Sequence, residues 1–179
     1  DTARGAAGRD ILIGGAGEDE LMGQGGSGDI LIGGAGDDLL DGGGGIDRIV
    51  ETADSDFVLT DRTLVGGPSV GTDKLVSIEQ ANLTGGAGAN TLDASAFSGK
   101  TVLSGGDGND ILLGGSNSDI LLGGDGKDQI TGGAGSDRVD GGADADTIDV
   151  AEAPNPDGID QVVTDLADFV FLDPVDLLI

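Results

Sequence analysis

The chain has 179 residues and a formal net charge of −26, with 34 acidic against 8 basic side chains. A protein this acidic repels nucleic acid and anionic membrane surfaces, so its natural small partner is a cation. It has no Cys and no His, which removes disulfides, thiol nucleophiles, the usual general base and the usual zinc ligand. We therefore expect a protein that is not an enzyme. No apolar run approaches the roughly 18 residues of a membrane span.

Residues 5–50 repeat a nine-residue unit, G-G-x-G-x-D-x-U-x, in which U is an apolar residue. In the first copy Ala6 replaces the second glycine, and the stretch GQGGSGDILI (residues 23–32) is one residue too long. The extra residue predicts a bulged loop at that point. The acids at the sixth position of this block are Asp10, Asp19, Asp29, Asp38 and Asp47.

Residues 51–104 interrupt the repeat. Runs of β-branched, apolar and aromatic residues predict strands at Phe57–Thr60, Thr63–Val65, Leu75–Ile78 and Thr101–Leu103. One degenerate copy of the unit, residues 85–93, carries Asn90 in place of the acid. We expect this segment to form irregular connecting coils that continue the architecture of the blocks.

Residues 105–150 hold five further copies in strict register. A single acid in a glycine-rich turn is commonly a turn former that caps its own backbone, but turn formation does not require an acid at every ninth position. Asn117 and Asp144 stand where the fourth-position glycine is expected. The acids of this block, each nine residues apart, are Asp110, Asp119, Asp128, Asp137 and Asp146.

Residues 151–179 complete the chain. A linker-like stretch, AEAPNPDG (residues 151–158), precedes predicted strands at Gln161–Thr164 and Phe169–Leu172. These strands can cap the open end of a repeat array, whose terminal unit has an uncovered face. The segments together are expected to make one continuous elongated domain.

The unit itself predicts an all-β fold. Its first six residues form turns, because glycine accepts positive φ, and its last three form a short strand with U pointing to one side. A helix is excluded by the glycine density, since each interior glycine costs roughly 1 kcal/mol. Turns and short strands that alternate at a constant period form a β-solenoid.

Apolar residues also occupy outward positions beside U, where polar residues are expected. We predict that the insert, the C-terminal tail or a partner covers these faces. The alternative is a set of single exposed aliphatic side chains, which soluble proteins tolerate. The residues are Ile11, Ile13, Ile30, Ile32, Ile111, Leu113, Ile120 and Leu122.

The unit resembles the nonapeptide of the repeats-in-toxin (RTX) family, whose calcium-binding β-rolls occur in secreted bacterial toxins, proteases, lipases and epimerases. The resemblance implies a right-handed parallel β-roll with two nonapeptides per turn, so that the loops of repeats i and i+2 lie on the same edge. It also implies a calcium ion between two such loops. The implied pairs are Asp10 with Asp29, Asp19 with Asp38, Asp29 with Asp47, Asp110 with Asp128, Asp119 with Asp137 and Asp128 with Asp146.

These pairs imply about six or more Ca²⁺ ions, held by the ten aspartates and by main-chain carbonyls. Calcium takes six to eight oxygen ligands at about 2.3–2.6 Å, and glycine lets carbonyls approach an ion closely. The implied carbonyl ligands belong to Gly14, Gly15, Gly17, Gly33, Gly34, Gly36, Gly105, Gly106, Gly108, Gly114, Gly115, Gly123, Gly124, Gly126, Gly132, Gly133 and Gly135.

The function implied by the resemblance is calcium binding that drives folding outside the cell, within a larger secreted bacterial protein exported by type I secretion. Two alternatives stay open. The module could be a calcium-rigidified spacer or adhesive part of a cell-surface protein, or a carbohydrate-binding module of a secreted enzyme. With 8 basic residues and 4 Phe, a groove for an anionic glycan is poorly supported.

Overall fold

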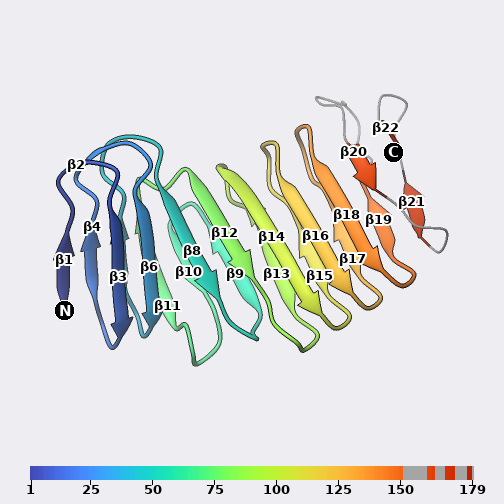
Figure 1. Ribbon diagram of the computed structural model, residues 1–179, viewed down its shortest axis with the longest axis horizontal. Coiled ribbons are helices and arrows are strands. Elements are labelled where there is room, and N and C mark those ends of the chain that lie inside the picture. The colour runs from blue at the N-terminus through green and yellow to red at the C-terminus, as the bar shows by residue number, and fades with distance from the viewer. Residues whose placement is uncertain (151–160, 164–167, 172–176, 179) are drawn as a thin grey trace.

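The computed structural model describes residues 1–150, 161–163, 168–171 and 177–178. The linker-like stretch 151–158 lies outside the described residues. The described residues form strands, turns and loops, and contain no helix that is long and apolar enough to cross a membrane. Strands stack one behind another along an elongated molecule, from β1 at one end to β20–β22 at the other (Figure 1).

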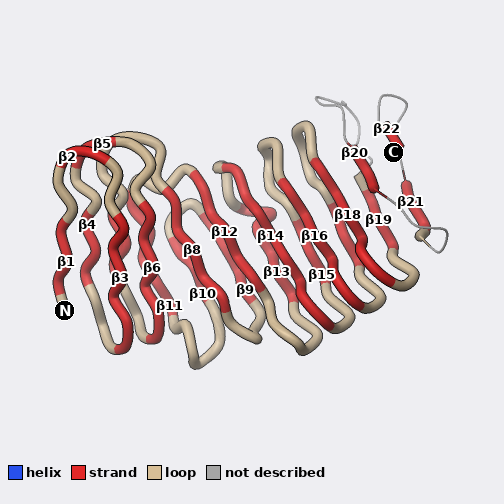
Figure 2. The backbone as a smooth tube through the Cα atoms, viewed as in Figure 1, coloured by secondary structure: helices blue, strands red, loops and turns tan. Residues whose placement is uncertain are grey.

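The strands form two facing sheets (Figures 1 and 2). The first sheet has eleven strands in the order β1 (Thr2–Arg4), β4 (Glu20–Met22), β7 (Leu39–Asp41), β11 (Thr72–Val76), β10 (Thr63–Val65), β9 (Phe57–Thr60), β13 (Thr91–Ala96), β15 (Ile111–Leu113), β17 (Gln129–Thr131), β19 (Thr147–Asp149) and β21 (Phe169–Phe171). The second has nine, in the order β3 (Ile11–Ala16), β6 (Ile30–Ala35), β8 (Arg48–Thr52), β12 (Gln80–Thr84), β14 (Lys100–Asp107), β16 (Ile120–Asp125), β18 (Arg138–Ala143), β20 (Gln161–Val163) and β22 (Leu177–Leu178). The all-β parallel solenoid predicted from the repeat is confirmed.

Successive repeats alternate between the sheets, because each unit contains one strand and one turn. Strands of the same sheet therefore come from repeats i and i+2, and they pair in parallel with U opposite U. Leu12 lies opposite Leu31, and Leu112 opposite Ile130. The U side chains point between the sheets and form a single buried apolar column, with Leu31 and Leu112 fully inaccessible.

The insert lies in the walls of the solenoid. Strands β9, β10 and β11 form an antiparallel meander within the otherwise parallel first sheet, joined in parallel to β13 on one side and β7 on the other. Phe57 of β9 and Phe97, which follows β13, are buried in the core between the sheets. Two predicted strands, 57–60 and 63–65, have the predicted bounds, whereas β11 begins at Thr72, three residues before the predicted start.

The third copy of the unit, which has one residue too many, contains a short additional strand. Gly25–Gly26 form β5, which pairs in parallel with β2 (Ala7–Gly8) outside the two main sheets (Figure 2). Gln24 takes the second position of this turn with a φ of 72°. The extra residue of this turn follows the pairing, between Gly26 and Asp29, and the register of the flanking strands is intact, with Ile11 opposite Ile30.

The insert does not cover the outward apolar residues of the first block. Ile11 and Ile13 lie on β3, the terminal strand of the second sheet, and each is 63% exposed. Ile30 and Ile111 are half-buried by neighbours in their own sheets. The part of the prediction that placed the insert over these faces is wrong, because the strands of the insert lie within the two sheets and pair with the edges of repeat strands.

Second-position glycines allow the turns of neighbouring coils to stack in direct contact. Gly124 has a φ of +118°, and a Cβ at this position would collide with the carbonyl oxygen of Gly106. Gly15 has a similar φ of +110°, but a Cβ there would meet nothing within 4 Å, since none of the described residues stacks against it on that side. A substitution at Gly15 therefore reports the cost of the backbone conformation alone, whereas one at Gly124 reports that cost together with the clash against the neighbouring coil.

We expect Gly15→Ala to destabilise the fold by about 1–3 kcal/mol, the cost of an unfavourable φ. Gly124→Ala should cost more than about 4 kcal/mol, since a main-chain clash is added to that strain. Guanidinium unfolding of both variants in millimolar calcium measures the difference. Equal destabilisation would contradict the stacking explanation.

Candidate metal centres

The repeat aspartates line the two edges of the solenoid, at the turns that precede each strand. The turns that lead into the second sheet form the first edge, which carries Asp10, Asp29, Asp47, Asp119 and Asp137. The turns that lead into the first sheet form the second edge, which carries Asp19, Asp38, Asp110, Asp128 and Asp146. Nine of these ten side chains are buried, with exposed fractions of 0–6%, and Asp10 is half-buried.

A hydrogen bond joins the two members of every predicted aspartate pair. In each pair the main-chain N–H of one aspartate donates to Oδ1 of the aspartate in the next coil. The bonds run from Asp10 to Asp29 (2.8 Å), Asp19 to Asp38 (2.8 Å), Asp29 to Asp47 (3.0 Å), Asp110 to Asp128 (2.8 Å), Asp119 to Asp137 (2.9 Å) and Asp128 to Asp146 (2.8 Å). Within each block the aspartates therefore form ladders along the edges, in which each hydrogen-bonded pair is one rung.

The second carboxylate oxygen is buried without a hydrogen-bond donor at several rungs. A buried carboxylate oxygen that lacks a partner is costly, so it marks a place where another group is needed. The oxygens are Oδ2 of Asp19, Asp29, Asp38, Asp47, Asp110 and Asp128.

At five of these six turns, all but that of Asp38, a carbonyl oxygen of the next coil is among the atoms nearest to the first glycine together with the carboxylate. A Cβ placed on Gly23 would lie 2.5 Å from both Asp29 Oδ2 and the carbonyl oxygen of Gly42. A Cβ on Gly123 would meet Asp128 Oδ2 and the carbonyl oxygen of Gly141 in the same way. Each such turn thus places a carboxylate and a carbonyl beside one another with no side chain between them, which is a donor set suited to a hard cation.

In three turns the second-position N–H donates to the side chain of the turn's own sixth residue. We call these turns closed, and we call the turns of the six aspartates listed above open. The second-position N–H of Ala6 donates to Asp10 Oδ2 (2.8 Å), and that of Gly115 donates to Asp119 Oδ2 (2.8 Å). Gly86 donates in the same way to the amide oxygen of Asn90 (2.9 Å). The second position lacks positive φ in these closed turns, whereas it has positive φ in the turns of the six open aspartates above. The closed copies are those with Ala6, Asn90 or Asn117 in place of a repeat residue.

Burial raises the pKa of several of these carboxyl groups. The pKa of Asp128 is raised to about 6, first by desolvation and then by the charges of Asp146 and Asp110. Desolvation also raises the pKa of Asp38, Asp110 and Asp119, against main-chain hydrogen bonds that lower it. A bound cation would remove the repulsion that these buried charges exert on each other.

Two acids of the insert continue the ladders beyond the repeats. Asp38 N–H donates to Asp73 Oδ1 (3.0 Å), and Asp47 N–H donates to Glu79 Oε2 (2.9 Å). Both acids were missed in the sequence because no glycine pair precedes them. A weaker signal was present, since each precedes a buried apolar residue, Leu75 or Ala81, by two positions.

The fit to calcium depends on main-chain oxygens as well as on aspartates. Among the described residues, no three Asp or Glu side chains come close enough to hold an ion by themselves. Calcium needs six to eight oxygens, so two carboxylates per rung must be completed by carbonyls of the turns. Carbonyl oxygens that lie beside the carboxylates at the first glycines can supply such ligands, and the residues therefore fit the ion.

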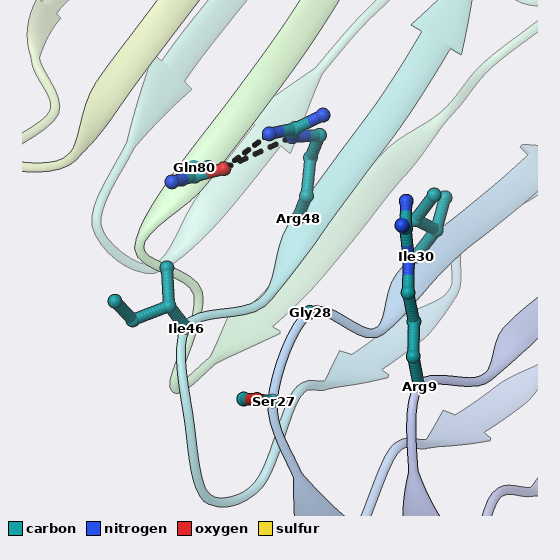
Figure 3. Close-up of a pocket in the computed structure, with 7 residues that line it drawn as sticks. All are labelled: Arg9, Ser27, Gly28, Ile30, Ile46, Arg48 and Gln80. Atoms are coloured by element: carbon teal, nitrogen blue, oxygen red, sulfur yellow. Dashed lines mark hydrogen bonds between the residues drawn. The ribbon is translucent and has the colours of Figure 1, made fainter.

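A different hollow lies on the outer surface of the second sheet and carries basic groups. It has a volume of about 400 Å³ and is lined by Arg9, Ser27, Gly28, Ile30, Ile46, Arg48 and Gln80. In Figure 3 the guanidinium group of Arg48 points to the amide oxygen of Gln80, which accepts hydrogen bonds from Nε (3.1 Å) and Nη2. This hollow contains no acid, so it is not a cation site.

The chain was compared with family models, curated proteins and solved structures. The family described as the RTX calcium-binding nonapeptide repeat (4 copies) matches residues 1–28, 24–49, 82–96, 95–130 and 113–148. No curated protein matches the sequence. Among solved structures, the extracellular lipase LipA from Serratia marcescens is similar, with a TM-score of 0.40 and 18% identity over 90% of this chain and 32% of the lipase chain. Because the matched segments span more than half of the sequence, the chain belongs to the family of RTX calcium-binding nonapeptide repeat proteins.

Proposed function

We propose that the chain is a calcium-dependent folding module of a larger secreted bacterial protein. The observation that carries the proposal is the ladder of buried aspartates, in which carboxylate oxygens without a donor recur beside main-chain carbonyl oxygens of the next coil. The ligands are the ten repeat aspartates together with carbonyls of the repeat glycines. The two blocks and the connecting coils act as one elongated domain.

The ion number follows from the rungs. Six aspartate pairs make six sites, which agrees with the number implied by the repeat. In four of them the Oδ2 that faces the next coil has no donor: the sites of Asp19 with Asp38, Asp29 with Asp47, Asp110 with Asp128 and Asp128 with Asp146. In the sites of Asp10 with Asp29 and Asp119 with Asp137, a main-chain N–H already occupies that oxygen. We therefore propose four stronger and two weaker sites.

The physiological role that fits this chemistry is folding after export. The module would pass a secretion channel unfolded and fold in extracellular calcium, for which sites with dissociation constants of about 10⁻⁴–10⁻³ M are sufficient. Its alternative role as a calcium-rigidified spacer of a surface protein uses the same sites. A carbohydrate-binding role is less well supported, because Arg48 in the basic hollow is already bonded to Gln80.

Calcium titration by isothermal calorimetry tests the proposal. We expect four ions to bind more tightly than two others, and magnesium to bind far more weakly because it requires a smaller octahedral shell. Absence of binding at millimolar calcium would refute the proposed function. Six equal sites would instead contradict the division into open and closed turns.

A further inference from the structure

The insert contains a half-turn that imitates the second half of a nonapeptide turn. Gly71, Thr72 and Asp73 follow in the order of positions four to six, and Leu75 occupies the U position opposite Leu40. Gly71 has a φ of +95° and stacks against the carbonyl oxygen of Gly36, as fourth-position glycines do elsewhere. The only sequence signal for this half-turn is the spacing between Asp73 and Leu75, and the family match does not include these residues.

Main-chain hydrogen bonds hold this half-turn on the Asp38 turn as they hold two repeats together. Gly36 N–H donates to the Val70 carbonyl (3.0 Å), as Gly17 N–H donates to the Ala35 carbonyl (2.7 Å) between two repeats. Asp38 N–H donates to Asp73 Oδ1 at 3.0 Å, which is the rung geometry of the repeats. The second edge of the first block therefore has one coil more than the repeat count gives.

The rung between Asp38 and Asp73 has unpaired oxygens on both members. Asp73 is 0% exposed and Asp38 is 3% exposed. Oδ2 of each is buried and accepts no hydrogen bond. By analogy with the repeats, this rung offers Oδ1 of Asp73, which contacts the Asp38 main chain, and the unpaired Oδ2 of Asp38.

A third buried acid, Glu51, contacts the second position of the Asp38 turn. Its Oε1 accepts the N–H of Gly34 at 3.1 Å. In closed turns the N–H at this second position caps the aspartate Oδ2, so Glu51 occupies the donor that would otherwise close Asp38. Glu51 is 5% exposed, and it brings a further negative charge to a junction where it has no ion pair with Lys or Arg within the described residues.

We propose that Asp38 and Asp73 bind a further calcium ion, which fastens the first repeat block to the insert, with Glu51 as a positioning residue. The inference rests on the proposed calcium binding of the repeats and extends it to residues outside them. Main-chain carbonyls of the two turns complete the shell. Glu51 acts through charge and through the Gly34 N–H, because the three carboxylates do not converge on one point among the described residues.

The electrostatics of the junction support the presence of a cation. Burial, followed by the charges of Asp38, Glu51 and Asp37, raises the pKa of Asp73 to about 7. The pKa of Glu51 is also raised, first by desolvation. A surface hollow of about 580 Å³, rich in acidic residues, borders the junction and is lined by Asp37 and Asp38 among others.

Ion counting on variants of the whole chain tests the junction site. Asp73→Asn should lose one ion of the wild-type number in calorimetry or native mass spectrometry. Glu51→Gln retains an oxygen for Gly34 and should keep the fold, yet weaken one ion by about ten- to a hundredfold, the usual effect of a residue that supports a metal ligand. Asp61→Asn is the matched control: it removes one charge from an exposed turn of the same insert and should keep every ion.

The outcomes separate the two proposals. If wild type binds no calcium, the proposed function fails together with this site. If wild type binds calcium and both Asp73→Asn and Glu51→Gln retain all ions at unchanged affinity, only the junction site is overturned, and Asp73 is then a protonated structural acid. Should Asp73→Asn fail to fold in calcium, the affinity of Glu51→Gln decides the question.

Discussion

Removal of calcium with a chelator should abolish most of the strand signal in circular dichroism. The fold without an ion holds nine repeat aspartates at exposed fractions of 6% or less in a chain with a net charge of −26. The apolar core offers little compensation, because each nine-residue unit buries one U side chain, worth roughly 1.5–3 kcal/mol, while ordering each residue costs about 1–2 kcal/mol. Ion binding therefore supplies folding free energy that the packing lacks.

The measurement is a calcium titration followed by far-ultraviolet circular dichroism, beginning in excess chelator. Strand content should rise cooperatively with calcium and fall again when chelator is restored. Magnesium at the same concentration, which matches the ionic strength and the charge, is the control and should restore little structure. An unchanged spectrum in chelator would mean that the aspartate ladders fold without a cation.

The periodic part of this architecture could be predicted from the sequence, because a nine-residue period fixes both the alternation of sheets and the direction of U. The pairing of Asp110 with Asp128, two repeats apart, follows from the same period and from the family resemblance. The structure places these two residues on one rung. Periodicity is thus sufficient to predict which aspartates of the repeat form a pair.

The difference between open and closed turns could not be predicted in this way. Gly115 and Gly124 occupy the same repeat position, yet only Gly124 has positive φ. A Cβ on Gly124 would meet the regular turn of Gly106, whereas one on Gly115 would meet the carbonyls of Ala94 and Phe97 in an irregular coil. All three closed copies depart from the repeat at Ala6, Asn90 or Asn117, but a departure does not by itself predict closure, because the copy with Asp144 keeps a positive φ at Gly142. At Gly115 the glycine is retained, and what differs is the irregular coil stacked against the turn.

Asp73 was missed for a related reason. Its half-turn lacks the glycine pair, so the only local signal is an acid two residues before Leu75. The antiparallel meander of β9 to β11 brings this half-turn against Asp38 from 35 residues away in the sequence. A contact of that kind is set by tertiary pairing and has no period that could reveal it.

Substitution of Asp128 should remove two calcium ions, which is the largest effect that we expect from a single carboxylate. Its Oδ1 lies on the rung with Asp110, and its Oδ2 faces the carbonyl oxygen of Gly141 in the next coil, on the rung with Asp146. In Asp128→Asn the charge disappears from both rungs. The calcium concentration needed for folding should rise by about tenfold or more as two linked sites are lost.

Asp110→Asn is the matched comparison because it makes the same chemical change one coil earlier on the same edge, at the same 1% exposure. Asp110 shares a charged rung only with Asp128, since its other neighbour is Asn90, whose amide oxygen already accepts the N–H of Gly86. It should therefore lose one ion. Ion counts from native mass spectrometry at saturating calcium, with circular dichroism to verify the fold, distinguish the two variants. If both lose the same number of ions, an aspartate does not serve two sites, and each ion then belongs to a single turn.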